Sequence, residues 1–109
     1  MENRRYTLSD IEQSLFYQMP KFLFAGEYKS LSNDARVLYS ILRDRHQLSM
    51  KNRWVNKRGE VYIIYPRESM AEEIGVGSLT TIRKYISQLI AAGLMTEERQ
   101  GLNKPNRIY

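Results

Sequence analysis

A run of small polar side chains without any acid begins at Ser78 and continues along the next predicted helix. Its members are Ser78, Thr80, Thr81, Lys84, Ser87 and Gln88. Hydroxyl, amide and ammonium groups hydrogen-bond to base edges and phosphates, whereas phosphates repel carboxylates. No Asp or Glu occurs between Ser78 and Thr96. These residue types predict contact with DNA, and a solvated helix face without a partner is the alternative.

A helix over residues 79–92 would hold this polar set on one side. At about 100° per residue, the apolar residues of the segment fall on one arc and the polar set lies opposite. The predicted core arc is Leu79, Ile82, Ile86, Leu89 and Ile90, with Tyr85 and Ser87 on its flanks and Arg83 near the core edge. Ser78 is the expected N-cap. Gly93 is the expected left-handed residue after the helix, with Leu94 folding back on Leu89.

A shorter helix is predicted just before this one, with Pro66 at its first position and its end near Ile74. Its inward-facing residues are Met70, Ala71 and Ile74. The turn Gly75-Val76-Gly77 joins the two helices, which gives a helix-turn-helix. Arg67, at the start of the shorter helix, is placed to contact a phosphate.

Two strand-like segments follow, Met95–Gln100 and Asn106–Tyr109, and the turn 101–105 joins them. A helix-turn-helix closed by a β-hairpin is a winged helix, so the expected fold class is α+β and mostly α. Basic and amide residues of the hairpin are predicted to lie along a DNA backbone or to enter a minor groove. They are Arg99, Lys104, Asn106 and Arg107. An ordinary charged hairpin is the alternative.

The middle of the chain is predicted to supply a helix and a first hairpin. A helix from Ser32 to about Arg45 has the apolar stripe Ala35, Leu38, Ile41 and Leu42, with Arg36 off the stripe. Residues 46–60 are expected to be a polar connection, with a hairpin turn at Asn56–Gly59 between the strands Trp54-Val55 and Val61–Tyr65. Trp54 and Tyr62 are expected in the core. Four cations, Lys51, Arg53, Lys57 and Arg58, are interpreted as a solvated loop or partner surface rather than as phosphate contacts.

Residues 1–30 are predicted to be an arm that packs on the domain or on a partner, and residues 31–109 to be the winged-helix domain. A capping box, Ser9-Asp10-Ile11-Glu12, predicts a short helix. Residues 16–20 are expected to be extended, and Pro20 to open a helical turn at Lys21–Phe24. The aromatic residues of the arm, Phe16, Tyr17, Phe22 and Phe24, are interpreted either as a self-association surface or as buried core.

The whole composition agrees with a small DNA-binding domain. The chain has 109 residues, a net charge of +5 and no cysteine, and its pI is about 9.6. No apolar run approaches the ~20 residues that span a bilayer, and no secretory leader is present, so a soluble cytoplasmic protein is expected. The single histidine, His46, is expected at a helix end, and no phosphate-cradling loop or metal-ligand spacing occurs. We therefore expect no enzyme activity, cofactor or metal.

Several motifs in order resemble the N-terminal domain of plasmid replication initiator protein A, the RepA type, of theta-replicating plasmids in Gram-positive bacteria, including staphylococci. They are Phe16–Lys21, Leu31–Ala35, Asn52–Asn56, Gly59–Ile63 and Gln100–Tyr109, and the resemblance runs from about Tyr6 to Tyr109. Two positions depart from the expected pattern. Pro66 replaces a small polar cap, and Gly77 beside Ser78 loosens the turn.

The resemblance implies a winged helix that binds repeated double-stranded DNA sites, called iterons, at a plasmid origin. It also implies a separate C-terminal domain, absent here, that recruits host replication proteins. On that basis Tyr109 marks a domain boundary. Self-association as a dimer or larger assembly would bridge origins and control plasmid copy number. A transcriptional repressor of the same fold, and a winged helix used only for protein contact, are the alternatives.

Overall fold

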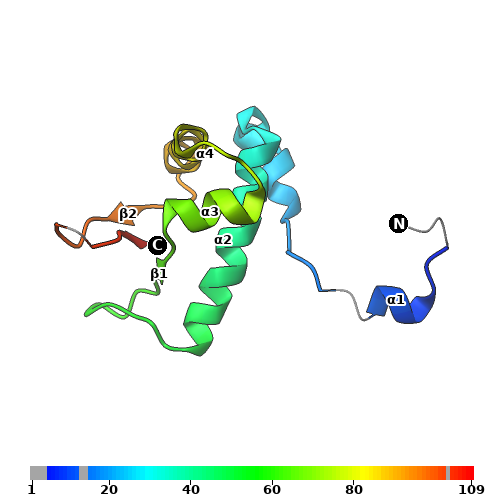
Figure 1. Ribbon diagram of the computed structural model, residues 1–109, viewed down its shortest axis with the longest axis horizontal. Helices are drawn as coiled ribbons and strands as arrows, with labels where there is room; N and C mark the ends of the chain where they lie inside the picture. The colour runs from blue at the N-terminus through cyan, green and yellow to red at the C-terminus, as the bar shows by residue number, and fades with distance from the viewer. Residues whose placement is uncertain (1–4, 13–14, 103) are drawn as a thin grey trace.

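One long helix organises the molecule and separates its two sides. The computed structural model describes residues 5–12, 15–102 and 104–109. Helix α2 (Asn33–Lys51) runs through the middle. Helices α3 (Arg67–Ile74) and α4 (Leu79–Ala91) and the sheet lie on one side of it. The 3₁₀ turns η1 (Lys21–Phe24) and η2 (Gly26–Ser30) and the short helix α1 (Leu8–Glu12) lie on the other (Figure 1).

A small antiparallel sheet joins the end of the chain to its middle. Its strands are β1 (Ile63–Ile64), β2 (Glu97–Glu98) and β3 (Arg107–Ile108), in the order β1-β3-β2. The predicted pairing of the last two strands is confirmed. The pairing of β1 with β3, with Ile63 opposite Ile108, was not predicted. We call residues 95–109 the C-terminal hairpin and residues 54–62 the central hairpin; Asn103, in the predicted turn, lies outside the described residues.

The core draws on every major element, as the apolar patterns predict. Leu38 of α2, Met70 of α3 and Ile82 and Leu89 of α4 are fully buried, and so is Leu23 of η1. The predicted stripe of α2 and the inward face of α3 are confirmed. The fold class, α+β and mostly α, is confirmed together with the order helix, turn, helix, hairpin. Because Leu23 lies in this core, the turns before α2 pack as part of the body.

Helix α2 is longer than predicted, and this moves His46. The helix continues to Lys51, past the predicted end at Arg45. The apolar stripe stops near Leu42, but residues such as Gln47 and Lys51 are good helix formers, so the backbone has no reason to leave the helix. It ends just before Arg53, whose φ is +56°. His46 is therefore half-buried inside the helix rather than at its end.

The cap positions predicted at Gly93 and Ser78 are confirmed, and those predicted for the starts of α3 and α1 are corrected. Gly93 has φ +75°, and the Leu94 amide bonds the Leu89 carbonyl at 2.9 Å, so the predicted Schellman cap is confirmed. Pro66 is the N-cap of α3 rather than its first residue. Ser78 holds the N-cap position of α4, but its side chain makes no capping bond. The capping pair of α1 is Thr7 with Asp10, because each backbone amide bonds the other side chain.

Arg36, predicted to lie off the apolar stripe, is buried instead. Its Nε donates to the Leu23 carbonyl oxygen at 2.8 Å, and its Nη1 donates to the Asn33 Oδ1 at 2.6 Å. Its Nη2 reaches the Tyr28 carbonyl oxygen at 3.3 Å. The guanidinium also lies over the Phe24 ring, 4.3 Å from the centroid. Because these carbonyl groups belong to η1 and η2, this one cation fixes both turns on α2.

The central hairpin is less regular than predicted. Its turn is confirmed, with φ +78° at Gly59, but the two sides meet only in a single bridge between Val55 and Val61. The predicted strand after the turn is reduced to β1. Trp54, predicted in the core, is 47% exposed, whereas Tyr62 is half-buried.

The segment before η1 is extended, as predicted, and a carboxylate holds it on the body. Glu73 of α3 accepts hydrogen bonds from the Tyr17 and Tyr65 hydroxyls and lies 3.1 Å from the Arg45 guanidinium. Burial alone would raise the pKa of the Glu73 carboxyl, but these three donors outweigh burial and leave the pKa below its usual value. Within the described part of the chain, no helix is long and apolar enough to cross a membrane.

This lowered pKa makes a pH-dependent contribution of Glu73 to stability that can be measured. The contribution is present above the unfolded-state pKa of about 4.3 and is lost as the pH falls through the lower folded-state pKa. We expect Glu73→Gln to lower the free energy of unfolding by about 1 kcal/mol near neutral pH. The difference from the unmodified protein should shrink in acid, as measured by urea denaturation. Glu72→Gln, at the exposed neighbour, is the control, and an equal effect there would contradict the assignment.

Candidate nucleic-acid interface

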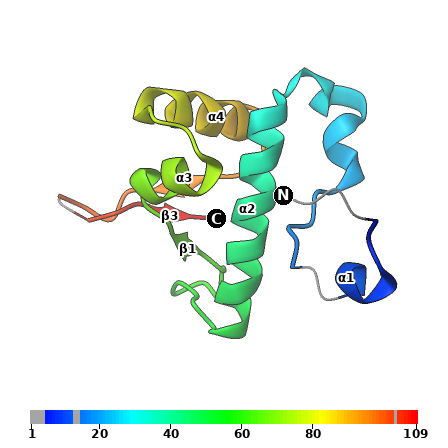
Figure 2. The same cartoon turned by 45° about the vertical axis from the view of Figure 1, so that its right-hand side comes forward.

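Helix α4 presents one continuous outward face at the edge of the molecule (Figure 2). The residues of this reading face, all exposed, are Thr80, Arg83, Lys84, Ser87 and Ala91. Opposite them, Ile82, Tyr85, Ile86 and Leu89 are buried. Ser78 is exposed at the start of the helix, and because its hydroxyl does not cap the helix it is available to a ligand. The face combines two cations with hydroxyl groups and contains no acid.

The buried side of α4 is rotated from the predicted arc. Leu79 and Ile90, predicted in the core, are 38% and 43% exposed, and Tyr85, predicted on a flank, is buried. The Tyr85 hydroxyl donates to the Asp34 Oδ2 at 2.9 Å, so its polar end is satisfied while its ring packs in the core. When Tyr85 is counted as a core residue, the predicted core arc of α4 shifts and Arg83 falls on the exposed side. Counting Tyr85 in this way would have added Arg83 to the predicted contact residues.

Two predicted contact residues, Thr81 and Gln88, lie beside the reading face rather than on it. Both are half-buried. The Gln88 Oε1 accepts a hydrogen bond from the Ser32 backbone amide at 2.9 Å, at the start of α2. Gln88 therefore helps to fix α4 on α2. A DNA contact by either residue stays a prediction.

Arg67 lies in a cleft between the start of α3, the start of α4 and the C-terminal hairpin. Its Nη2 is 2.8 Å and 3.1 Å from the two carboxylate oxygens of Glu97. The Asn106 Nδ2 donates to the same carboxylate at 2.8 Å. The side chain of Glu97 is only 12% exposed. Two predicted contact residues, Arg67 and Asn106, are thus held by one buried carboxylate that joins the hairpin to α3.

The cations of the C-terminal hairpin divide into free and engaged residues. Arg99 and Lys104 are exposed, and neither side chain forms an ion pair with a described residue. Arg107 is half-buried, with its Nε on the Gln100 Oε1 at 3.1 Å and its guanidinium over the Tyr62 ring at 4.5 Å. Arg99 and Lys104 are therefore the hairpin cations with the most freedom to meet a phosphate, and Arg107 braces the sheet.

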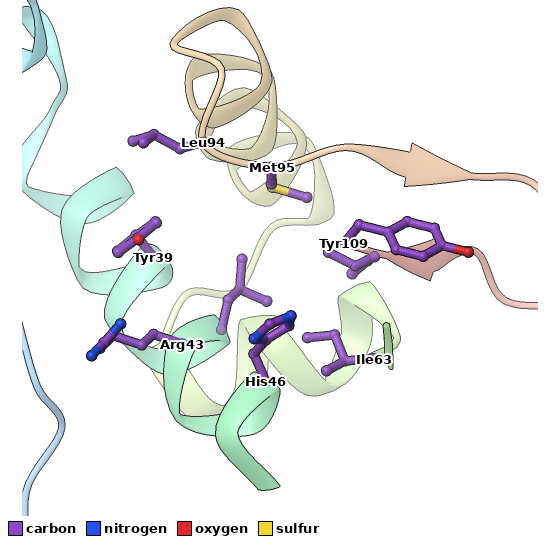
Figure 3. A pocket seen from close by; sticks show the side chains of 9 residues that line it. Tyr39, Arg43, His46, Ile63, Leu94, Met95 and Tyr109 are labelled. Atoms are coloured by element: carbon purple, nitrogen blue, oxygen red, sulfur yellow. The ribbon is translucent and has the colours of Figure 1, made fainter. Parts of the chain in front are cut away.

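A separate cavity of about 160 Å³ opens between α2, β1 and the C-terminal hairpin (Figure 3). Arg43 and His46 reach it from α2, and the rings of Tyr39 and Tyr109 lie on opposite sides. The remaining lining is aliphatic apart from Met95, and among the described residues none of the lining side chains is acidic.

Comparison with known proteins identifies relatives over nearly the whole chain. The family described as replication initiator protein A (RepA) N-terminus matches residues 15–109. A 41 kDa protein of Lactobacillus helveticus is 35% identical over 115 aligned residues, which cover 97% of this chain and 32% of that protein. The chain thus spans about a third of the length of this relative.

Solved structures share the fold. One described as the N-terminal domain of a DNA-binding protein matches with a TM-score of 0.78 and 39% identity, over 99% of this chain and 82% of the other. One described as a Rep–DNA complex gives the same TM-score and identity over 97% and 82% of the two chains. A third, described as an MDR initiator, matches with a TM-score of 0.75 and 36% identity, over 97% and 84%.

Proposed function

Because this chain belongs to the replication initiator protein A (RepA) N-terminus family, we propose that it binds double-stranded DNA sequence-specifically at repeated sites of a plasmid origin to initiate replication. The observation that carries the proposal is the acid-free reading face of α4, with Arg83 and Lys84 exposed among hydroxyl groups. A similar protein was solved as a Rep–DNA complex, which supports the choice of ligand.

The proposed mode is that of a winged helix. Helix α4 enters a major groove with its N-terminal residues on the base edges. Thr80 meets a thymine methyl group or a base edge, and Lys84 reaches guanine acceptors. Arg83, the other cation of the face, is suited to a phosphate. The C-terminal hairpin then lies over the neighbouring backbone, where Arg99 and Lys104 meet phosphates.

Other parts of the proposal concern the longer protein and its partners. The 41 kDa relative is about three times as long as this chain. We therefore propose that the longer protein has a further domain, which recruits host replication proteins. Four aromatic residues before α2 are exposed, and we assign them to self-association, as a dimer or larger assembly that bridges iterons and controls copy number: Phe16, Tyr17, Phe22 and Phe24. The proposed place of action is the cytoplasm, and the proposed role is binding rather than catalysis.

A selection experiment tests sequence-specific binding and identifies the preferred site in the same step. The protein selects duplexes of about 30 base pairs from a randomised pool, a length that holds two half-sites one helical turn apart. Fluorescence anisotropy then compares the selected duplex with a shuffled version. We expect the selected duplex to bind at least about a thousandfold more tightly. If about six phosphates are neutralised, log K should fall against log salt with a slope near −5. Equal affinity for the two duplexes would refute sequence-specific binding.

A further inference from the structure

We propose that the central hairpin is a second phosphate-binding element, which extends the DNA footprint beyond the C-terminal hairpin. The proposal rests on the proposed DNA-binding function and adds a contact that the helix-turn-helix and the C-terminal hairpin do not supply. Its contact residues are Lys57 and Arg58 at the tip of the hairpin.

The charge of this segment is strongly positive. Between residues 51 and 60 the chain has four cations and one acid: Lys51, Arg53, Lys57, Arg58 and Glu60. Lys57 and Arg58 are exposed, and neither forms an ion pair with a described residue. The one acid, Glu60, is also exposed, and its Oε1 accepts from the Asn56 Nδ2 at 3.0 Å. The two tip cations are therefore free to meet an external anion.

The turn that carries these cations is held by its own hydrogen bonds. The Asn56 Oδ1 accepts from the backbone amides of Arg58, at 2.8 Å, and Glu60, at 3.0 Å. The Gly59 amide donates to the Asn56 carbonyl oxygen at 3.0 Å. A turn fixed in this way presents its side chains from a defined backbone, so less conformational entropy is lost on binding.

The central hairpin is also tied to the C-terminal hairpin. The Asn56 Nδ2 bonds the Tyr109 hydroxyl at 3.2 Å. A groove of about 380 Å³ separates the two hairpins, with Lys57 and Arg58 on one side and Arg107 on the other. Two carboxylates, Glu60 and Glu98, also border this groove. The Glu98 carboxylate is occupied by Arg107 at 3.8 Å and by the Tyr109 hydroxyl at 3.3 Å, and the Glu60 carboxylate accepts from the Asn56 side chain. The hairpins therefore form one edge with outward cations.

The position of that edge identifies the partner. In two views 45° apart, α4, the C-terminal hairpin and the central hairpin follow one another down the same side of the molecule (Figures 1 and 2). When α4 occupies a major groove and the C-terminal hairpin lies over the adjoining backbone, the next element along that side meets the phosphates beyond. Cations without internal partners fit phosphates there, and they would add affinity without reading sequence.

The test is the double variant Lys57→Ala/Arg58→Ala, measured by anisotropy on the selected and shuffled duplexes over a range of salt concentrations. Both side chains are exposed, so the variant should keep its unfolding temperature. We expect both duplexes to bind about tenfold more weakly, with a salt slope less negative by about 2, because each lost phosphate contact removes about one unit. The ratio of the two affinities should not change.

A matched control removes one lysine and one arginine from the other side of α2, as Arg5→Ala/Lys21→Ala. This control should leave the salt slope within error of the unmodified protein. An unchanged slope in the Lys57→Ala/Arg58→Ala variant, or an equal loss in the control, would overturn the proposal. If the unmodified protein itself binds without salt dependence, DNA binding by the domain fails, and this outcome is distinct from failure of the hairpin contact alone. If the central hairpin binds an acidic protein partner instead of DNA, the salt slope of the Lys57→Ala/Arg58→Ala variant would also be unchanged, and the proposal would be overturned.

Discussion

Replacing Glu97 with glutamine is expected to weaken binding of the selected duplex by roughly 1–3 kcal/mol, the value of about one good contact, although the change removes a negative charge. Glu97 joins the C-terminal hairpin to Arg67 and Asn106. A neutral amide loses the charge-assisted bonds to Arg67, whose buried Nε already has no partner. The hairpin and the start of α3 then lose their fixed relation, and the contacts that depend on it weaken.

Whether Glu97→Gln weakens or strengthens DNA binding distinguishes a positioning role of Glu97 from simple charge repulsion. If Glu97 acted only as a charge near DNA, its removal would strengthen binding of every duplex. Glu98→Gln is the matched control, because Glu98 is the next residue in the same strand and its side chain is 56% exposed. We expect Glu98→Gln to leave binding unchanged or slightly tighter, on both duplexes. Equal tightening by both variants would show that Glu97 does not position the hairpin.

The second large effect is expected from Lys84→Ala, in the middle of the reading face. We expect the selected duplex to lose roughly 1–3 kcal/mol of binding free energy, as for one base contact, and the shuffled duplex to lose much less. Lys84 is exposed and forms no ion pair with a described residue, so its removal should not destabilise the fold. Anisotropy titrations on both duplexes measure the change in their ratio.

Two comparisons sharpen this result. Arg83→Ala should weaken both duplexes alike, because a phosphate contact carries no sequence information. Lys21→Ala removes the same charge as Lys84→Ala from the other side of α2 and should change neither affinity. If Lys84→Ala weakens both duplexes to the same extent, Lys84 contacts a phosphate rather than a base. If the variant binds with unchanged affinity, α4 does not contact the bases through this face.

Local patterns in the sequence predict the elements of this fold well. The apolar spacing of α2 and α3 places Leu38 and Met70 in the core, and Gly93 ends α4 as a left-handed residue. These features depend on periodicity and backbone sterics within a few residues, and the sequence contains that information directly. The family resemblance was specific for the same reason, since it depended on several short motifs in order.

Features that depend on long-range partners were missed. Arg36 looks like a surface cation until η1 and η2 fold back and offer it their carbonyl groups. Tyr85 looks like a flank residue until Asp34 satisfies its hydroxyl. The pairing of Glu97 with Arg67 was not predicted either, because it requires contact between residues that are far apart in the chain. Burial of a polar side chain depends on its partners, and one residue's type does not identify them.

The most direct measurement of the central claim is a map of the amides that respond to DNA. Amide correlation spectra are recorded while the selected duplex is added to the unmodified protein. The largest shift changes are expected at Thr80, Arg83, Lys84 and Ser87 of α4 and along the C-terminal hairpin. The exposed residues of α2 should change little. Changes concentrated on α2 or on the segment before η1, with α4 unaffected, would contradict the claim that α4 reads the bases.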